Sequence, residues 1–175
     1  CPMPAKRIIF IREDHYTRFD HNKLGIDTLE KRGFPVEFWD CSEIFRPQFK
    51  GVQRARGINE FSGLRFFLKK SSLLENIANL TSQDTLITTM VFKINTWSFL
   101  RQISKTKATW GTLYLGSLPT PPSESHFRSR LEKFIRRPST AVNFLLQKMP
   151  PKRLGFRAFD FILKGGTAPL LGAPA

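Results

Sequence analysis

Runs of apolar residues alternate with amphipathic segments along this chain, and this alternation predicts an α/β protein. Four consecutive apolar residues stand between the charged ends of 6–12, and apolar or β-branched runs also cover 35–40, 84–92, 109–115 and 159–163. Runs without apolar/polar alternation are typical of strands buried on both faces, as in a parallel sheet covered by helices. The sequence therefore predicts a three-layer, Rossmann-like domain with a mainly parallel sheet of about five strands.

The helices expected between these strands have recognisable ends. The first should begin at Asp20, an N-cap residue type, and end at Gly33, which suits the position just after a helix. Apolar residues at helical spacing predict a long amphipathic helix over 59–80. The other expected helices cover residues 95–103, 125–137 and 139–148.

Length and composition indicate one domain over residues 1–175. The chain has 175 residues, of which 41% are hydrophobic, so it can form a full core. It ends after a strand and a glycine turn, where doubly wound domains usually continue, so we expect a piece of a longer two-domain protein. No apolar run approaches the roughly 18 residues of a membrane span. Only four apolar residues lie between Arg7 and Arg12, which is too few for a signal-peptide h-region, so we expect no secretory signal. Cys1 and Cys41 predict no disulfide, which suits a reducing cytoplasm.

The strong positive charge of the chain indicates an anionic partner. The formal net charge is +14 and the pI is about 10.4, which calls for nucleic acid, an anionic membrane surface or a phosphorylated substrate. Residues 125–157 carry nine basic side chains against one acidic side chain. A basic amphipathic helix can lie on anionic lipid; alternatively, the charges are only the solvated face of a core helix. The expected membrane- or anion-binding residues are Arg128, Arg130, Lys133, Arg136, Arg137, Lys152 and Arg153.

The loop after the first strand carries the candidate catalytic residues. Glu13, Asp14 and His15 follow the strand directly, and ligands of parallel sheets bind beyond the carboxyl ends of the strands. A histidine beside a carboxylate can act as a general base near neutral pH. The alternative is a solvated loop with a helix cap. The loop shows no recognised metal-ligand spacing, so no metal is expected.

A glycine turn after the last strand is the candidate phosphate site. Lys164, Gly165, Gly166 and Thr167 would bring backbone amides close to a ligand; the alternative is a tight strand-to-helix turn. No dinucleotide fingerprint or Walker loop is present, so no cofactor is expected, and Asp40 is interpreted as a turn cap rather than a ribose ligand. A second basic group that could contact phosphates comprises Arg46, Lys50, Arg54 and Arg56.

Two segments carry a resemblance to a known family. Residues 23–40 resemble the opening of many bacterial surface-polysaccharide glycosyltransferases, and 159–166 resembles a later strand of the same domain with its glycine turn. The resemblance implies the amino-terminal, acceptor-side half of a GT-B fold. It further implies a lipid-linked saccharide acceptor and a cytoplasmic location at the inner face of the cell membrane. The nucleotide-sugar donor would bind a second domain absent from this chain, so these 175 residues alone should not catalyse transfer.

Two other function classes remain open from the sequence. One is a basic nucleic-acid-binding module, in which Lys and Arg contact phosphates and Phe stacks on single-stranded bases. No RRM, KH or helix-turn-helix signature supports it. The other is a structural domain whose basic face docks on a larger anionic assembly.

Overall fold

The computed structural model describes residues 7–49, 61–90, 93–115, 139, 142–143, 145–146, 155–157 and 159–165. Its elements, in chain order, are β1 (Arg7–Arg12), α1 (Arg18–Lys23), α2 (Ile26–Lys31), β2 (Val36–Asp40), α3 (Ser42–Phe45), the 3-10 turn η1 (Pro47–Phe49), β3 (Leu64–Phe66), α4 (Lys70–Ala78), β4 (Asp84–Thr88), α5 (Ile94–Lys105), β5 (Thr109–Leu115) and β6 (Phe161–Gly165).

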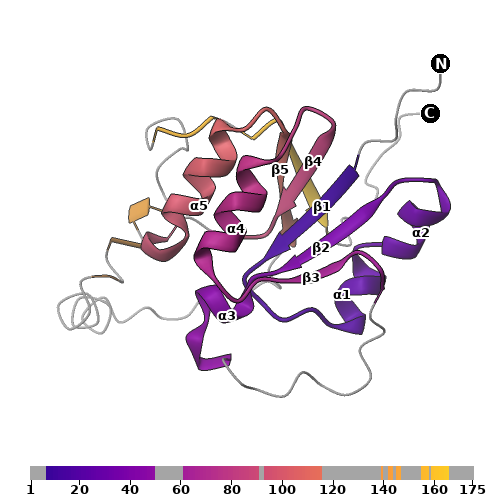
Figure 1. The fold of residues 1–175 in the computed structure, drawn as a ribbon, viewed down its shortest axis with the longest axis horizontal. Coiled ribbons are helices and arrows are strands. Elements are labelled where there is room, and N and C mark those ends of the chain that lie inside the picture. The colour runs from indigo at the N-terminus through magenta and orange to yellow at the C-terminus, as the bar shows by residue number, and fades with distance from the viewer. Residues whose placement is uncertain are drawn as a thin grey trace, which may run out of the picture.

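The strands form one parallel sheet between helices (Figure 1). Over the described residues the sheet has six strands in the order β3-β2-β1-β4-β5-β6, and every neighbouring pair is parallel. This confirms the predicted α/β, Rossmann-like, three-layer fold, with one strand more than expected. The order reverses at β1: the chain first moves outward through β2 and β3, then returns to add β4 on the other side.

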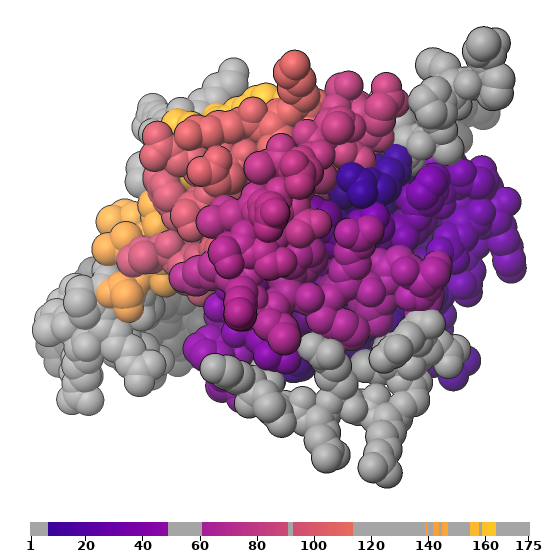
Figure 2. Space-filling view, viewed as in Figure 1, coloured from indigo at the N-terminus to yellow at the C-terminus, as the bar shows by residue number. Residues whose placement is uncertain are grey.

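Both faces of the sheet are buried at its central strands β1, β2 and β4, which is why these strands lack a regular alternation of buried and exposed residues. In β1, Ile9 and Ile11 are fully buried in one cluster with residues of α4 and α5, whereas Phe10 lies in a second cluster with Ile26 of α2. Figure 1 shows α4 and α5 side by side over the first face. In the space-filling view, atoms of residues 61–115 form most of the surface on this side (Figure 2).

The long helix predicted over residues 59–80 is wrong. The structure has β3 at Leu64–Phe66 and a helix only at Lys70–Ala78. The backbone carbonyl of Gly63 accepts a 2.9 Å hydrogen bond from the Phe38 amide, and a Cβ at Gly63 would lie 1.9 Å from the Val36 oxygen. Pairing of β3 with the edge of β2 thus outweighs the helical spacing of the apolar residues in this segment. Gly63 was the local sign that the segment is not a helix, because glycine often marks a close approach of another backbone.

The first helix also begins earlier than predicted, and it is divided. Thr17, not Asp20, is the N-cap: its hydroxyl accepts the Asp20 amide at 3.2 Å, while the Asp20 carboxylate accepts the Thr17 amide at 3.2 Å. This reciprocal capping box satisfies two otherwise unpaired amides. Gly25, with φ of 63°, separates α1 from α2. Gly33, with φ of 84°, follows α2 as predicted.

The remaining boundaries differ by a few residues. Strand β4 ends at Thr88 rather than at residue 92, α5 exceeds the predicted 95–103 at both ends, and β5 has its predicted bounds. The last strand begins at Phe161 because Asp160 caps β5: its amide donates to the Trp110 oxygen at 2.9 Å and its carboxylate accepts the Trp110 amide at 2.8 Å. The described residues within 139–148 are helical, as predicted; the predicted helix 125–137 lies outside the described residues.

Candidate functional site

The predicted catalytic residues lie where the order of the strands reverses. Glu13, Asp14 and His15 follow β1 directly, and β1 stands between β2 and β4. In open parallel sheets, ligands bind in the crevice beyond the carboxyl ends of the strands at such a reversal. The topology therefore puts these three residues at the position where this fold most often holds a ligand.

Glu13 contacts residues on both sides of β1, one beyond β4 and one beyond β2. It is a buried residue, and its carboxylate lies 2.9 Å from Nζ of Lys93 and 3.5 Å from the guanidinium of Arg46. Lys93 is the N-cap residue of α5, on the β4 side, whereas Arg46 follows α3, on the β2 side. A buried carboxylate needs such partners to remain charged, so Glu13 holds the loop in register with both neighbouring strands.

Asp14 is the most exposed member of the trio. Its side chain keeps 37% of its surface exposed, against 25% for His15 and 10% for Glu13. It lies 2.9 Å from Arg46 and 3.5 Å from Arg12, and Arg12 also binds Asp20. Asp14 is thus the carboxylate that an approaching ligand meets first, in a setting of two guanidinium groups.

His15 belongs to a partly buried hydrogen-bond chain. The Ser42 hydroxyl lies 2.5 Å from the Asp40 carboxylate and 2.8 Å from Nδ1 of His15. Because an ionised carboxylate only accepts, the hydroxyl donates to Asp40 and accepts from Nδ1–H. In the neutral imidazole this assignment leaves the lone pair on Nε2, which is a buried atom.

Asp40 ends β2 and organises both loops. It is 3% exposed and accepts hydrogen bonds from the amides of Tyr16 and Ser42, each at 3.0 Å. These contacts agree with the prediction that it is a turn cap. The neighbouring Cys41 is also buried, and burial, with the Asp40 charge adding to it, raises the pKa of its thiol. That thiol therefore stays protonated and is a weak nucleophile.

The predicted phosphate turn lies on the same edge of the sheet, away from β1. Lys164 and Gly165 end β6, and β6 is separated from β1 by β4 and β5. Three strand spacings make about 14 Å, so the two groups do not share one small-ligand site. Gly166 and Thr167 lie outside the described residues.

The predicted basic surface is not part of the described structure. The residues concerned are Arg128, Arg130, Lys133, Arg136, Arg137, Lys152 and Arg153. Of the second basic group, Arg46 is described, and it binds the two acidic residues of the first loop.

Sequence reasoning missed Lys93 and Ser42. The signal for Lys93 was a cation placed between a buried strand and a helix start, on the strand adjacent to β1. The signal for Ser42 was a hydroxyl two residues after Asp40, the spacing of an Asx-type turn. The contacts of Lys93 with Glu13 and of Ser42 with His15 depend on which strands are neighbours, and the sequence order alone does not give this.

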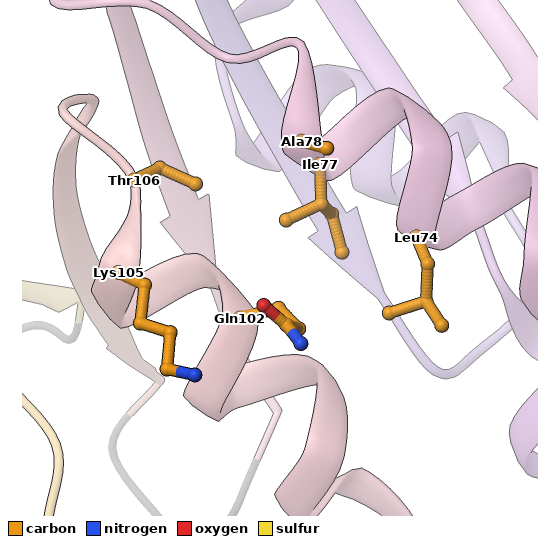
Figure 3. A pocket seen from close by; sticks show the side chains of 6 residues that line it. All are labelled: Leu74, Ile77, Ala78, Gln102, Lys105 and Thr106. Atoms are coloured by element: carbon orange, nitrogen blue, oxygen red, sulfur yellow. The ribbon is translucent and has the colours of Figure 1, made fainter.

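A surface cavity lies at the amino edge of the sheet, opposite the first loop. It has a volume of about 330 Å³ and is lined by Leu74, Ile77 and Ala78 of α4 and by Gln102, Lys105 and Thr106 at the end of α5 (Figure 3). Because these helices run antiparallel to the strands, their carboxyl ends lie at the amino edge of the sheet. The cavity is therefore on the opposite edge from the first loop, and its polar side chains are Gln102, Lys105 and Thr106.

Comparison with known proteins adds no assignment. No family model, curated protein or solved structure matches this chain. Within the described ranges, no group of three histidine, cysteine or acidic side chains is placed to hold a metal ion. None of the helices in those ranges combines the length and apolar character needed to cross a bilayer.

Proposed function

We propose that this chain is the acceptor-binding domain of a membrane-associated glycosyltransferase in bacterial surface-polysaccharide biosynthesis. The observation that carries the proposal is the gathering of Glu13, Asp14 and His15 with Arg46 and Lys93 at the reversal of a doubly wound parallel sheet. A carboxylate or imidazole there can take a proton from an acceptor hydroxyl. The nucleotide-sugar donor binds a second domain in this proposal.

The charges at the edge suit a lipid-linked acceptor. Such an acceptor carries a diphosphate between its sugar and its prenyl chain. The side chains of Arg46 and Lys93 keep 34% and 29% of their surface exposed, so both can turn part of their hydrogen-bonding capacity toward a phosphate. Asp14, beside Arg46, then lies near the sugar end, and it forms with His15 the acid–base pair that takes the proton of the acceptor hydroxyl as the oxygen attacks the donor sugar.

Binding of a soluble acceptor analogue tests the proposal. The probe is a short-chain polyprenyl diphosphate bearing one sugar, titrated into the ¹⁵N-labelled chain and followed by NMR. We expect shifts of the amides of residues 13–15 and 93–95. Arg46→Gln should weaken binding about five- to tenfold, the effect of one charge-assisted hydrogen bond. Lys105→Gln, an exposed cation at the other edge, is the matched control.

The same titration separates the proposal from its main alternative. A single-stranded oligonucleotide at the same salt concentration should bind more weakly than the acceptor analogue and move no amide of residues 13–15. Tighter binding of the oligonucleotide at these residues, or no response to the analogue, would overturn the acceptor proposal. The former result would favour a nucleic-acid-binding module.

A further inference from the structure

A second cavity, on the α1–α2 side of the sheet, is not used by the proposed chemistry. Its volume is about 210 Å³. It is lined by Tyr16, Arg18, His21, Asn22, Asp27 and Phe61. Tyr16 directly follows His15 in the chain, so the cavity begins one residue after the candidate catalytic loop.

A hydrogen-bond chain fixes the floor of this cavity. The Tyr16 hydroxyl bonds Nδ1 of His21, and Nε2 of His21 lies 2.7 Å from the Asp27 carboxylate. Burial, followed by the charges of Asp27, Asp20 and Glu30, raises the pKa of Tyr16 to about 12. The hydroxyl is therefore protonated at neutral pH and donates to Nδ1, which leaves Nε2–H to donate to Asp27.

Aromatic rings form the apolar part of the same floor. The Phe61 ring lies with its centre 5.7 Å from that of Tyr16 and 5.5 Å from that of His21. Tyr16 is 1% exposed, so it cannot swing out of the wall. The three rings hold one another in place and present a rigid, partly aromatic surface.

The rim of the cavity carries free hydrogen-bonding groups of both kinds. Arg18, Asn22 and Asp27 are exposed. In the part of the chain that the structure describes, the side chains of Arg18 and Asn22 form no hydrogen bond or ion pair. Asp27 binds His21 through one carboxylate oxygen. The rim therefore offers guanidinium and amide donors beside amide and carboxylate acceptors. Arg18 and Asn22 belong to α1, and Asp27 belongs to α2.

The groups that line the cavity favour a neutral polar ligand over an anionic or an apolar ligand. Among the described residues that line the cavity, Arg18 is the one cation, and an anion would meet it beside carboxylates whose charges already raise the pKa of Tyr16. An apolar ligand would bury the charged rim without hydrogen bonds, which is costly. A neutral sugar ring has hydroxyls that both donate and accept, and a C–H face that packs on aromatic rings. The volume is below the roughly 300 Å³ at which sites for drug-sized ligands begin, so it suits one such ring.

We infer that this cavity is a subsite for one neutral pyranose unit. The sugar face packs on Phe61, while its hydroxyls bind Arg18, Asn22 and the second oxygen of Asp27. The inference rests on the proposed function and deepens it, because it names the part of the chain that would hold a sugar of the acceptor next to the first loop.

Neutral methyl glycosides test the subsite directly. The ¹⁵N-labelled chain is titrated with methyl glucoside, galactoside, mannoside and N-acetylglucosaminide, and one of them should move the amides of residues 16–22 and 61. We expect a Kd of about 1–10 mM, typical of a few hydrogen bonds to one small ring. Asn22→Ala should raise this Kd about five- to tenfold, and Phe61→Leu, which keeps an apolar side chain in the wall, should raise it as well. Arg32→Ala, an exposed cation on the same side but outside the cavity, should leave it unchanged.

Three results would overturn the subsite: no response of these amides to any glycoside, a response that Asn22→Ala and Phe61→Leu leave unaltered, or stronger binding of inorganic phosphate at the same residues. The two proposals fail separately. If the acceptor analogue moves residues 13–15 while glycosides leave the cavity unmoved, the subsite fails and the proposed function stands. If glycosides bind the cavity while the analogue leaves residues 13–15 and 93–95 unmoved, the proposed function fails.

Discussion

At the scale of single residues, buried carboxylates organise both edges of the sheet. At the carboxyl edge, Asp40 accepts two backbone amides and the Ser42 hydroxyl, which fixes the loop that carries His15. At the amino edge, Glu37 accepts from Arg7, Arg65 and the Trp39 indole, at 3.1, 3.0 and 2.8 Å. Each buried charge is stable because several donors replace the water that it loses.

His15 is the residue whose proposed role is most directly testable. In a transferase containing this domain and its donor-binding partner, His15→Ala should lower turnover about 10²–10⁴-fold, the usual effect of losing a general base. His15→Asn is the matched variant, because its amide can still donate to the Ser42 hydroxyl but cannot act as a base. Recovery of full turnover in His15→Asn would show that His15 only positions the loop.

Asp84 should make the stability of the domain sensitive to acid. Burial alone would raise its pKa, but hydrogen bonds from Arg7 and Thr81 outweigh burial and hold the pKa below its ordinary value of 3.8. A carboxylate with a lowered pKa in the folded state stabilises the protein above the unfolded pKa, and this stabilisation is lost as the pH falls through the folded value. The free energy of unfolding should therefore decrease on acidification below about pH 4.

The Asp84→Asn variant checks this dependence. Urea unfolding at pH 7 should show lower stability than in the unmodified chain, with a smaller further loss between about pH 4 and pH 2. Glu75→Gln, at an exposed position of α4, is the control and should keep the original pH profile. An unchanged profile in Asp84→Asn would contradict the role of the pair with Arg7.

At the scale of elements, the glycine after α2 sets the direction of β2. The amide of Phe34 donates to the Leu29 carbonyl at 3.1 Å, and that of Gly33 donates to the Glu30 carbonyl at 2.8 Å, which together form a Schellman motif. The φ of Gly33 is 84°, and a Cβ there would meet no atom within 4 Å. The requirement for glycine is therefore conformational and not steric.

Substitutions at Gly33 should follow backbone preference and not side-chain size. Gly33→Val should lower the free energy of unfolding by about 1–2 kcal/mol, because a β-branched residue is strained in the left-handed region. Gly33→Asn should cost less, since Asn enters that region more readily. Thermal unfolding of both variants is the measurement. Equal losses would mean that α2 can end without the Schellman motif.

At the scale of the whole molecule, the charge of +14 predicts binding to anionic membranes through residues 125–157. In liposome co-sedimentation the chain should bind anionic vesicles at low salt and release them at high salt. Reversing Arg136 and Arg137 to Glu should weaken binding by about 1 kcal/mol for each charge removed. Reversing Lys69 and Lys70, which are exposed at the start of α4, makes the same change in net charge and is the control.

Two results would contradict this membrane prediction. Equal binding to neutral and anionic vesicles would show that charge is not the cause. Equal weakening by the two pairs of reversals would show that net charge acts without a particular basic surface.

Features that depend on neighbouring residues could be predicted from the sequence, whereas features that depend on contacts between distant segments could not. The strands at 7–12, 36–40 and 109–115 were correctly located, because apolar, aromatic and β-branched residues are concentrated in each of these short segments. The segment 59–80 was misassigned because its apolar spacing fits a helix, whereas the decisive contact is between Gly63 and β2, some 25 residues earlier. In the candidate site, Glu13, Asp14 and His15 were chosen from their place after a strand, and the structure confirms only that place. Lys93 could not be chosen in this way, because it is 80 residues away from Glu13.

The sequence by itself determined the α/β class, the parallel sheet and the polar loop at the end of its first strand, because hydrophobic periodicity and turn residues act over a few neighbouring positions. The tertiary structure decided the strand order, and with it which side chains meet. Lys93 reaches Glu13, His15 joins Asp40 through Ser42, and Phe61 closes the Tyr16–His21 cavity. These contacts join distant segments, and their energies depend on burial and on the exclusion of water, which arise only when the layers pack together.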